Sequence, residues 1–181
     1  VWGDNGRHQL EVTAEITGVK ALAAGSGYTL ALKNDGTVTA WGSVNGQYAK
    51  LNGTTVKAVD AWWNSSSAAL TEDNQIVVWG GYGERVVQSD KNLVDIAINS
   101  SYLLALAADG TVKAWEWRRY QDGIFLNDCL PCAVPDGFSG DVVAITAGEN
   151  HALALKADGS VVCWGNDEYP VPAGLADVRA V

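Results

Sequence analysis

A hairpin-like phrase occurs four times in this chain, and that repetition constrains the fold more than any other feature. The copies read YTLALKNDGTVTAWG at 28–42, SAALTEDNQIVVWG at 67–80, YLLALAADGTVKAWE at 102–116 and HALALKADGSVVCWG at 151–165. Each copy alternates apolar and small residues, passes through a turn rich in Asn, Asp and Gly, and continues in a β-branched arm that ends at Trp. Four hairpins of one design predict an all-β repeat fold.

A second apolar pattern precedes each hairpin and adds one strand to every unit. It reads VKALAAG at 19–25, VKAVDAW at 56–62, LVDIAIN at 93–99 and VVAITAG at 142–148. Each unit therefore holds three clear strands, and a fourth is possible in the linking segment, for example around residues 48–51. Successive hairpin tryptophans, at 2, 41, 79, 115 and 164, lie 39, 38, 36 and 49 residues apart. A small antiparallel sheet repeated at such a period is the blade of a β-propeller, in which neighbouring blades share a core.

The repeat divides the chain into units within a single repeat domain. The full units are approximately 4–42, 43–80, 81–116 and 117–165, with partial units at 1–3 and 166–181. VWG at 1–3 matches the end of a unit, and VRAV at 178–181 matches the start of one. Because the counterpart of residues 23–39 is missing between them, we expect both edges to meet further propeller sequence, from the same polypeptide or a neighbouring chain. Residues 1–181 alone are expected to self-associate or to be poorly stable.

Composition excludes several classes of function. The 181 residues are 48% hydrophobic and 18% charged, which is typical of a globular domain with a sizeable core. The sequence contains no run of about 18 apolar residues, so it predicts no membrane span. The net charge of −9 repels phosphate backbones and argues against nucleic acid. With two histidines, and no nucleophile–base pair or paired carboxylates at recognisable spacing, the sequence predicts no metal site, no cofactor and no enzyme.

The repeated pattern V-x-A-[IV]-x-A-G-x-x-[HY]-x-L-A-L-K-x-D-G-[TS]-V-x-x-W-G resembles the regulator-of-chromosome-condensation repeat. GSVNGQ at 42–47 is similar to that family's segment after the Trp. Units one and four match closely, whereas unit two departs at Trp62-Trp63 and at 73–75, and unit three departs at Asn99 and Glu116. The resemblance implies propeller blades of this type. Because such proteins typically close as seven blades, it also implies that four full repeats form only part of a ring.

The same resemblance implies less about function. The family includes exchange factors, β-lactamase inhibitors, light-receptor proteins and bacterial surface proteins, and fold does not determine function. Its nuclear member contacts chromatin, but the acidic balance of this chain argues against a DNA role. The propeller-type β-lactamase inhibitors are more similar in repeat length and texture, and they bind through aromatic residues in the loops of one face.

Residues that recur at one position in every unit are predicted to be structural. The hairpin tryptophans are expected to pack between blades: Trp41, Trp79, Trp115 and Trp164. Tyr28, Tyr102 and His151 share the position that opens the second strand. Because Tyr and His alternate there, a shared structural hydrogen bond is favoured over catalysis.

Departures from the repeat are the better candidates for a binding site. Two adjacent tryptophans, Trp62 and Trp63, replace small residues in a loop, and we expect one to be structural and the other exposed. The insertion at 116–140 brings in Trp, Arg and Tyr, which dominate binding energetics. Because the loop between strands one and two and the segment after the Trp lie at the same blade end, these loops should gather on one face, together with 45–48 and Ser100. The predicted contact residues are Trp62, Trp63, Asn64, Tyr82, Tyr102, Trp117, Arg118, Arg119, Tyr120, Glu149 and Asn150.

Three cysteines carry two different expectations. Cys129 and Cys132 form a C-L-P-C motif inside the insertion, without the second ligand pair that zinc needs and without a βαβ setting. A local disulfide is the preferred interpretation, with reduced thiols as the alternative. Cys163 takes the place of Ala40 and Ala114 and is predicted to be a small buried residue.

Three classes of function stay open. The leading hypothesis is a non-enzymatic module that binds a protein through one loop face. A carbohydrate-binding propeller would instead use Trp62, Trp63, Tyr82 and Trp117 as stacking platforms. A structural repeat segment of a surface protein or filament is the third. The expected location is extracellular or at the cell surface, and glycosylation triplets begin at Asn52, Asn64 and Asn99.

Overall fold

The computed structural model describes most of the chain. The described residues are 3–12, 16–43, 51, 53–63, 66–80, 83–99, 101–116, 120–121, 124–125, 133–135, 138, 140–165 and 170–181. Their regular structure is antiparallel β-sheet, as predicted, and none of them lies in an α-helix. The chain forms two compact units, Val1–Asp90 and Lys91–Val181. Each unit contains two of the predicted blades.

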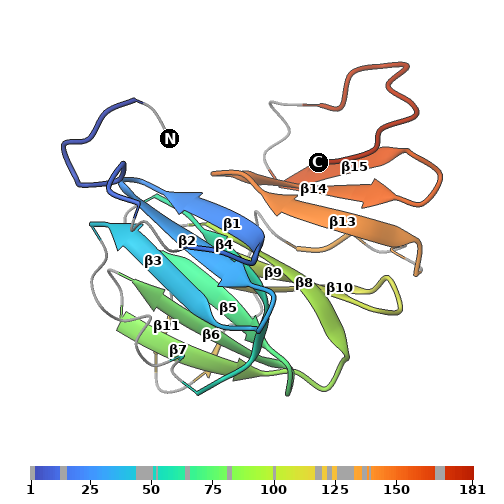
Figure 1. Ribbon diagram of the computed structural model, residues 1–181. Helices are drawn as coiled ribbons and strands as arrows, with labels where there is room; N and C mark the ends of the chain where they lie inside the picture. The colour runs from blue at the N-terminus through green and yellow to red at the C-terminus, as the bar shows by residue number, and fades with distance from the viewer. Residues whose placement is uncertain are drawn as a thin grey trace. The chain divides into compact units, whose positions relative to one another are not determined.

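Unit 1 holds blades 1 and 2 (Figure 1). Blade 1 consists of β1 (Val19–Gly25), β2 (Tyr28–Lys33) and β3 (Val38–Gly42), in that order. Blade 2 consists of β4 (Val56–Ala61), β5 (Ser67–Thr71), β6 (Gln75–Gly80) and β7 (Gly83–Gln88). A fourth strand thus occurs in blade 2, after the hairpin Trp. Residue 51, at the end of the segment considered for a fourth strand, lies in a 3-10 turn, and 48–50 are outside the described residues.

Unit 2 holds blades 3 and 4 (Figure 1). Blade 3 consists of β8 (Leu93–Ile98), β9 (Tyr102–Ala107) and β10 (Val112–Glu116), and blade 4 of β13 (Val142–Ala147), β14 (His151–Lys156) and β15 (Val161–Gly165). Inside the long insertion, β11 (Tyr120–Gln121) pairs with β12 (Ile124–Phe125). The expected strand at 178–181 is wrong, because these residues are irregular and pair with no sheet among the described residues.

The hairpin turns follow from their Asp-Gly sequence. In blades 1, 3 and 4 the Asp carboxylate accepts a hydrogen bond from the backbone N–H two residues later. The Gly after it takes a positive φ, as at Gly36 (78°). In blade 2 the sequence lacks this Gly, and Asn74 takes its place with φ at 62°. A side chain that tolerates the left-handed region therefore keeps the turn where the consensus is lost.

These turn carboxylates should make the fold sensitive to acid below about pH 4. Hydrogen bonds hold the pKa of Asp35, Asp109 and Asp158 below the ordinary value of about 3.9, for Asp109 chiefly the bond from Lys91. Because each folded-state pKa is lower than the unfolded one, this stabilisation is present above the unfolded pKa and is lost as pH falls through the folded pKa. Carboxyl titrations by NMR should give midpoints below about 3.9 for all three, and above it for Asp95, whose pKa is raised by burial. Midpoints in the reverse order would contradict the assignment.

Within each unit one blade packs face to face on the next. We call the face toward the next blade the trailing face and the face toward the preceding blade the leading face. In unit 1, Leu30 and Leu32 on the trailing face of blade 1 are 1% and 0% exposed and cluster with Val56, Ala69 and Trp79 of blade 2. Fully burying one such leucine contributes about 1.5 to 3 kcal/mol, so the blade interface is the core of the unit.

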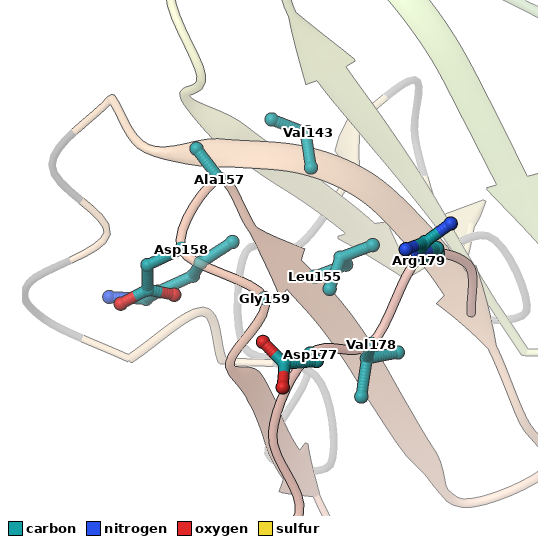
Figure 2. Close-up of a pocket in the computed structure, with 9 residues that line it drawn as sticks. Val143, Leu155, Ala157, Asp158, Gly159, Asp177, Val178 and Arg179 are labelled. Carbon is teal, nitrogen blue, oxygen red and sulfur yellow. The ribbon is translucent and has the colours of Figure 1, made fainter.

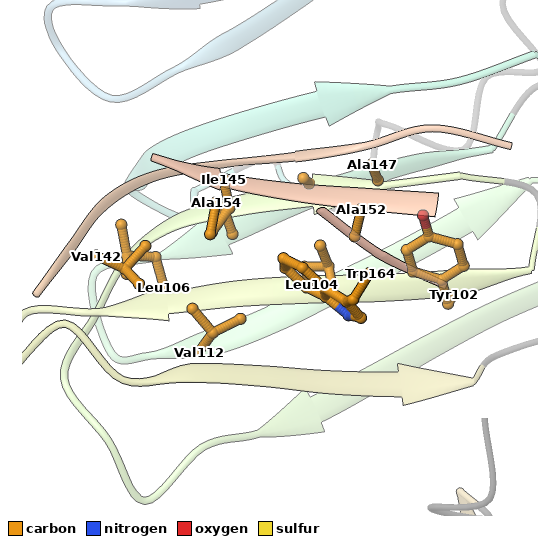
Figure 3. Close-up of a cluster of buried hydrophobic side chains, with 11 residues drawn as sticks. Tyr102, Leu104, Leu106, Val112, Val142, Ile145, Ala147, Ala152, Ala154 and Trp164 are labelled. Carbon is orange, nitrogen blue, oxygen red and sulfur yellow. The ribbon is translucent and has the colours of Figure 1, made fainter. Parts of the chain in front are cut away.

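Unit 2 repeats this arrangement with other residues. Tyr102, Leu104 and Leu106 of β9 pack on Ala152 and Ala154 of β14, in a cluster that also includes several flanking residues (Figure 3). The cluster members from the flanking strands are Ala97, Val112, Val142, Ile145, Ala147 and Trp164. Alternate residues of β9 and β14 therefore face one another, as period-two alternation on strands requires.

The hairpin tryptophans occupy the predicted positions, with different degrees of burial. Trp79 and Trp164 are 6% and 7% exposed and lie in the two clusters, which confirms packing between blades for these two. Trp41 and Trp115 are half-buried. The Trp41 indole N–H donates to the Gln9 carbonyl at 3.0 Å.

Two further residues near Trp164 refine the sequence expectations. Phe138, from the end of the insertion, meets the Trp164 ring edge-on with ring centroids 5.3 Å apart. The insertion therefore returns an aromatic ring to the core of unit 2. Cys163 is half-buried rather than buried, because its side chain lies on the trailing face of blade 4. Cys129 and Cys132 are outside the described residues, so their disulfide stays a prediction.

Candidate functional site

The predicted loops meet at one end of every blade. The first residue of each second strand pairs with the end of the third, as in Tyr28 with Gly42 and His151 with Gly165. In blade 1 the Ser43 N–H also donates to the Gly27 carbonyl at 2.8 Å, which ties the segment after the Trp to the turn between β1 and β2. The same blade end therefore carries both loops, as the strand order predicts. We call this end of the two blades in unit 1 rim 1, and the corresponding end in unit 2 rim 2.

Rim 1 is held together by the Tyr28 hydroxyl. It donates to the Ser66 carbonyl at 2.9 Å and lies 2.7 Å from the Ser67 hydroxyl, so it links the turn of blade 1 to the loop of blade 2. Tyr28 is 4% exposed, and burial raises its pKa, which keeps the hydroxyl protonated as a donor. This confirms the predicted structural hydrogen bond at this repeat position.

Rim 2 uses the same position and adds a buried amide. The Tyr102 hydroxyl donates to the carbonyls of Gly148, at 3.0 Å, and His151. The Asn99 amide donates to the Gly148 and Glu149 carbonyls, while its Oδ1 accepts from two backbone N–H groups, of Ser101 and Tyr102. One side chain therefore joins the turn of blade 3 to the turn of blade 4.

Burial changes the expected role of two residues of rim 2. Tyr102 was among the predicted contact residues, but it is 1% exposed with its hydroxyl engaged, so it offers no surface to a partner. Burial also raises its pKa, and the hydroxyl stays protonated. Asn99, which opens a glycosylation triplet, is 0% exposed and cannot carry a glycan in this fold.

The loop of blade 2 separates the two adjacent tryptophans. Trp62 is half-buried, and its backbone N–H donates to the Ser66 carbonyl at 2.7 Å. Trp63, in contrast, is 70% exposed. One structural and one exposed Trp is the arrangement that the sequence predicted. Trp63 is the most exposed large hydrophobic side chain among the described residues.

A paired substitution explains how Trp62 fits. In blade 1 the Tyr28 ring lies over Gly25, where a Cβ would come within 2.0 Å of the ring. Blade 4 repeats this with His151 over Gly148, at 2.6 Å. Blade 2 has Trp62 at the position of the Gly and Ser66 at the position of the ring, so the bulky side chain and the small one exchange places. Sequence reasoning noted the missing Gly but not its coupling to the residue that opens the second strand.

The structure describes three of the remaining predicted contact residues. Glu149 and Asn150 are exposed at rim 2, in the turn between β13 and β14. Tyr120 lies in β11. The others lie outside the described residues and stay predictions: Asn64, Tyr82, Trp117, Arg118 and Arg119.

A groove lies at the opposite end of blade 4 from rim 2. Its volume is about 520 Å³, and it is lined by the hairpin turn at 157–159, by Val143 and Leu155, and by the terminal segment at 177–179 (Figure 2). Its charged side chains include Asp158, Asp177 and Arg179. The lining contains no nucleophile beside a base, and no cluster of three or more metal-ligating side chains occurs in the described part of the chain. Among the same residues, no helix has the length and apolar character to cross a membrane.

Known proteins share both the repeat and the fold. The family described as the regulator of chromosome condensation (RCC1) repeat matches residues 19–48 and 142–169, which cover blades 1 and 4. The E3 ubiquitin-protein ligase HERC2 of Mus musculus is 28% identical over 176 aligned residues, covering 76% of this chain and 4% of HERC2.

Solved structures share the fold over most of the chain. The CRINKLY WD40 ectodomain of the Arabidopsis thaliana receptor kinase ACR4 aligns with a TM-score of 0.63 at 20% identity, covering 88% of this chain and 55% of that chain. Prp20p of Saccharomyces cerevisiae aligns with a TM-score of 0.55 at 22% identity, covering 82% of this chain and 44% of Prp20p. The chain thus spans at most about half the length of these relatives. The three- and four-stranded antiparallel units, their order and these matches show that the chain is built from propeller-type blades, and that blades 1 and 4 carry repeats similar to the regulator-of-chromosome-condensation repeat.

Proposed function

We propose that this chain is a non-enzymatic module that binds a protein partner through its loop rims, with Trp63 at the centre of the contact. The observation that carries the proposal is the 70% exposure of Trp63 on a loop that breaks the repeat. Exposed Trp side chains are common hot spots, because one ring supplies a large apolar contact. An extracellular or cell-surface location is part of the same proposal.

Hydrogen bonds hold Trp62 and Ser66, the described residues on either side of Trp63. The backbone of Trp62, next to it, donates to the Ser66 carbonyl, and the Trp62 carbonyl lies 3.3 Å from the Tyr28 hydroxyl. Anchored neighbours reduce the conformational freedom that Trp63 loses on binding, which favours affinity.

The relatives support protein as the class of partner. Prp20p is described as binding Gsp1p and histones, and a second structure shows Kap60 bound to yeast RCC1. Carbohydrate stacking on both sides of a sugar would need paired exposed rings, and of the two adjacent tryptophans only Trp63 is well exposed. Protein recognition is therefore the better reading of rim 1.

Replacing Trp63 with alanine should remove most of the binding. Loss of a hot-spot Trp costs about 2 kcal/mol or more, so we expect affinity to fall at least about thirtyfold while the fold is unchanged. The partner is first captured on the immobilised wild-type chain from an extract of the source and identified by mass spectrometry. Its affinity for each variant is then measured by calorimetry.

Val86→Ala is the matched control, since Val86 is 54% exposed but lies in the middle of β7, away from the rim. It should bind like the wild type. Equal affinity of Trp63→Ala and wild type would contradict the rim 1 assignment. Specific binding on a glycan array that is lost in Trp63→Ala would replace the protein partner with a carbohydrate.

A further inference from the structure

An exposed arginine lies at rim 1, beside the turn between β1 and β2. Arg7 is exposed, and its guanidinium donates to the Ser26 carbonyl at 3.4 Å. A Cβ on Gly27 would come within 2.3 Å of the Arg7 Cδ, so the aliphatic part of Arg7 lies directly over that glycine. The segment at 3–12, dark blue in Figure 1, therefore passes the end of blade 1 that belongs to rim 1. The repeat pattern does not predict this placement, because Arg7 lies outside the strands and hairpins.

Gln9 holds the backbone around Arg7 in place. The Gln9 carbonyl accepts the Trp41 indole N–H at 3.0 Å, and its Oε1 accepts the Arg7 backbone N–H at 2.8 Å. The Gln9 amide nitrogen donates to the Asp4 carboxylate at 3.3 Å. One residue therefore ties the segment that carries Arg7 to a ring of blade 1. A side chain on an anchored backbone loses less conformational freedom when it binds a partner.

The Arg7 guanidinium forms no ion pair with any carboxylate of the described residues. The two acids nearest to it in the sequence are engaged elsewhere: Asp4 accepts from the Gln9 amide, and the Glu11 carboxylate lies 2.7 Å from the His8 Nδ1. The chain as a whole is acidic, with a net charge of −9. An unpaired guanidinium on such a surface defines one place where a partner's carboxylate binds without repulsion.

Tyr28 links the position of Arg7 to that of Trp63. It directly follows Gly27, on which the aliphatic part of Arg7 lies. The Tyr28 hydroxyl lies 3.3 Å from the carbonyl of Trp62, the residue before Trp63. The exposed cation and the exposed ring therefore lie on the same rim, connected through one buried tyrosine. A short extended segment of a partner is long enough to contact both. Arg and Trp are also the residue types that dominate binding energetics.

We propose that rim 1 binds a short extended segment of a partner protein, in which an acidic side chain pairs with Arg7 and an apolar side chain packs on Trp63. This inference rests on the proposed function and names the chemistry of the partner at that site. A guanidinium and a carboxylate can form a bidentate pair, which fixes the direction of the segment and adds affinity. Trp63 alone accepts many apolar surfaces, so Arg7 is the residue that selects among them.

Selection from a phage-displayed library of random dodecapeptides tests the pairing. Peptides are selected on the immobilised wild-type chain and kept only if they fail to bind Trp63→Ala; an acidic residue close to an apolar one should be enriched. A synthetic peptide of the enriched sequence is then measured by calorimetry. Arg7→Gln should bind it about tenfold more weakly, because a charged hydrogen-bonded pair is lost. Gln in place of the peptide's acid should cause the same loss, and both changes together should cost no more than either alone.

A charge exchange and a matched control make the result specific. Arg7→Glu should reject the acidic peptide and bind one in which lysine replaces the acid. Arg7→Lys keeps the charge but not the planar guanidinium, so its affinity should lie between those of the wild type and Arg7→Gln. Arg179→Gln removes the same charge from an exposed residue at the groove of blade 4, and it should bind like the wild type. Circular dichroism checks that each variant keeps its β-sheet signal, and the peptide without its acid gives the same answer with the wild-type chain.

The outcomes separate this inference from the proposed function. Equal affinity of Arg7→Gln and the wild type, with binding still lost in Trp63→Ala, would overturn the role of Arg7 alone. Selected peptides without an acid, or a selection that yields no peptide, would also overturn it. In those cases the proposed function is still decided by the captured partner and its affinity for Trp63→Ala. A captured partner that binds Trp63→Ala as tightly as the wild type would contradict both.

Discussion

Replacing Gly110 with alanine is expected to lower the free energy of unfolding by about 3 kcal/mol, a large loss for a single methyl group. Gly110 has a φ of 75°, which costs an L-residue about 1 to 2 kcal/mol. A Cβ at this position would also lie 2.4 Å from the carbonyl carbon of Gly140. Because the neighbour is backbone, the clash can be relieved only by moving the hairpin turn of blade 3 away from the segment that enters blade 4.

Gly174→Ala separates the two contributions. Gly174 has a φ of 82° but no atom within 4 Å of its added Cβ, so only the conformational cost of about 1 kcal/mol applies. Urea unfolding followed by tryptophan fluorescence should rank the variants as wild type, Gly174→Ala and Gly110→Ala, in order of falling stability. If both variants lost the same free energy of unfolding, the close approach to Gly140 would contribute nothing to the effect of Gly110→Ala.

Replacing Asn99 with alanine is expected to cost about 3 kcal/mol. Asn99 is 0% exposed, and its amide satisfies the carbonyls of Gly148 and Glu149 while its Oδ1 accepts the N–H groups of Ser101 and Tyr102. The substitution leaves buried partners without this side chain, and each lost bond of that kind costs about 1 to 3 kcal/mol. The loss should appear in chemical unfolding and as faster hydrogen exchange in β13 and β14.

Two comparisons make the Asn99 result specific. Asn150→Ala removes an exposed amide from the neighbouring turn and should change stability by less than about 0.5 kcal/mol. Asn99→Gly restores the residue that blades 1 and 4 carry at this position, yet it should be about as harmful as Asn99→Ala, because glycine cannot bridge the two turns. A neutral Asn99→Gly would mean that the position needs only a small residue.

The strands and turns of this protein follow from local sequence. The Asp-Gly turns, the β-branched arms and the repeat period place three strands in each unit, and the structure has them at 19–25, 28–33 and 38–42 and at the equivalent positions. These signals are local, because turn geometry and strand alternation depend on residues close in the chain. The same reasoning places both loops of a blade at one end and predicts a structural hydrogen bond at Tyr28, whereas the structure shows that the bond reaches the next blade.

The sequence predicts less well the strands and turns that depend on contacts with the rest of the fold. VRAV at 178–181 differs from VKAV, the start of β4, only by Arg for Lys, but it is not a strand and pairs with no strand among the described residues. The fourth strand of blade 2 at 83–88 and the Asn74 turn arose without the expected motif, since neighbouring strands and a tolerant side chain supplied what the consensus lacks.

The sequence by itself determined the repeat, the strands and the position of the aromatic residues along the chain. Only the tertiary structure decided which of these side chains are available to a partner. Tyr102 and Trp63 are both loop-end aromatics in sequence, but one is 1% and the other 70% exposed. The physical reason is that burial is set by the adjacent blade: the neighbouring turn covers Tyr102 and accepts its hydroxyl, whereas Trp63 lies beyond the reach of the turn that holds Trp62.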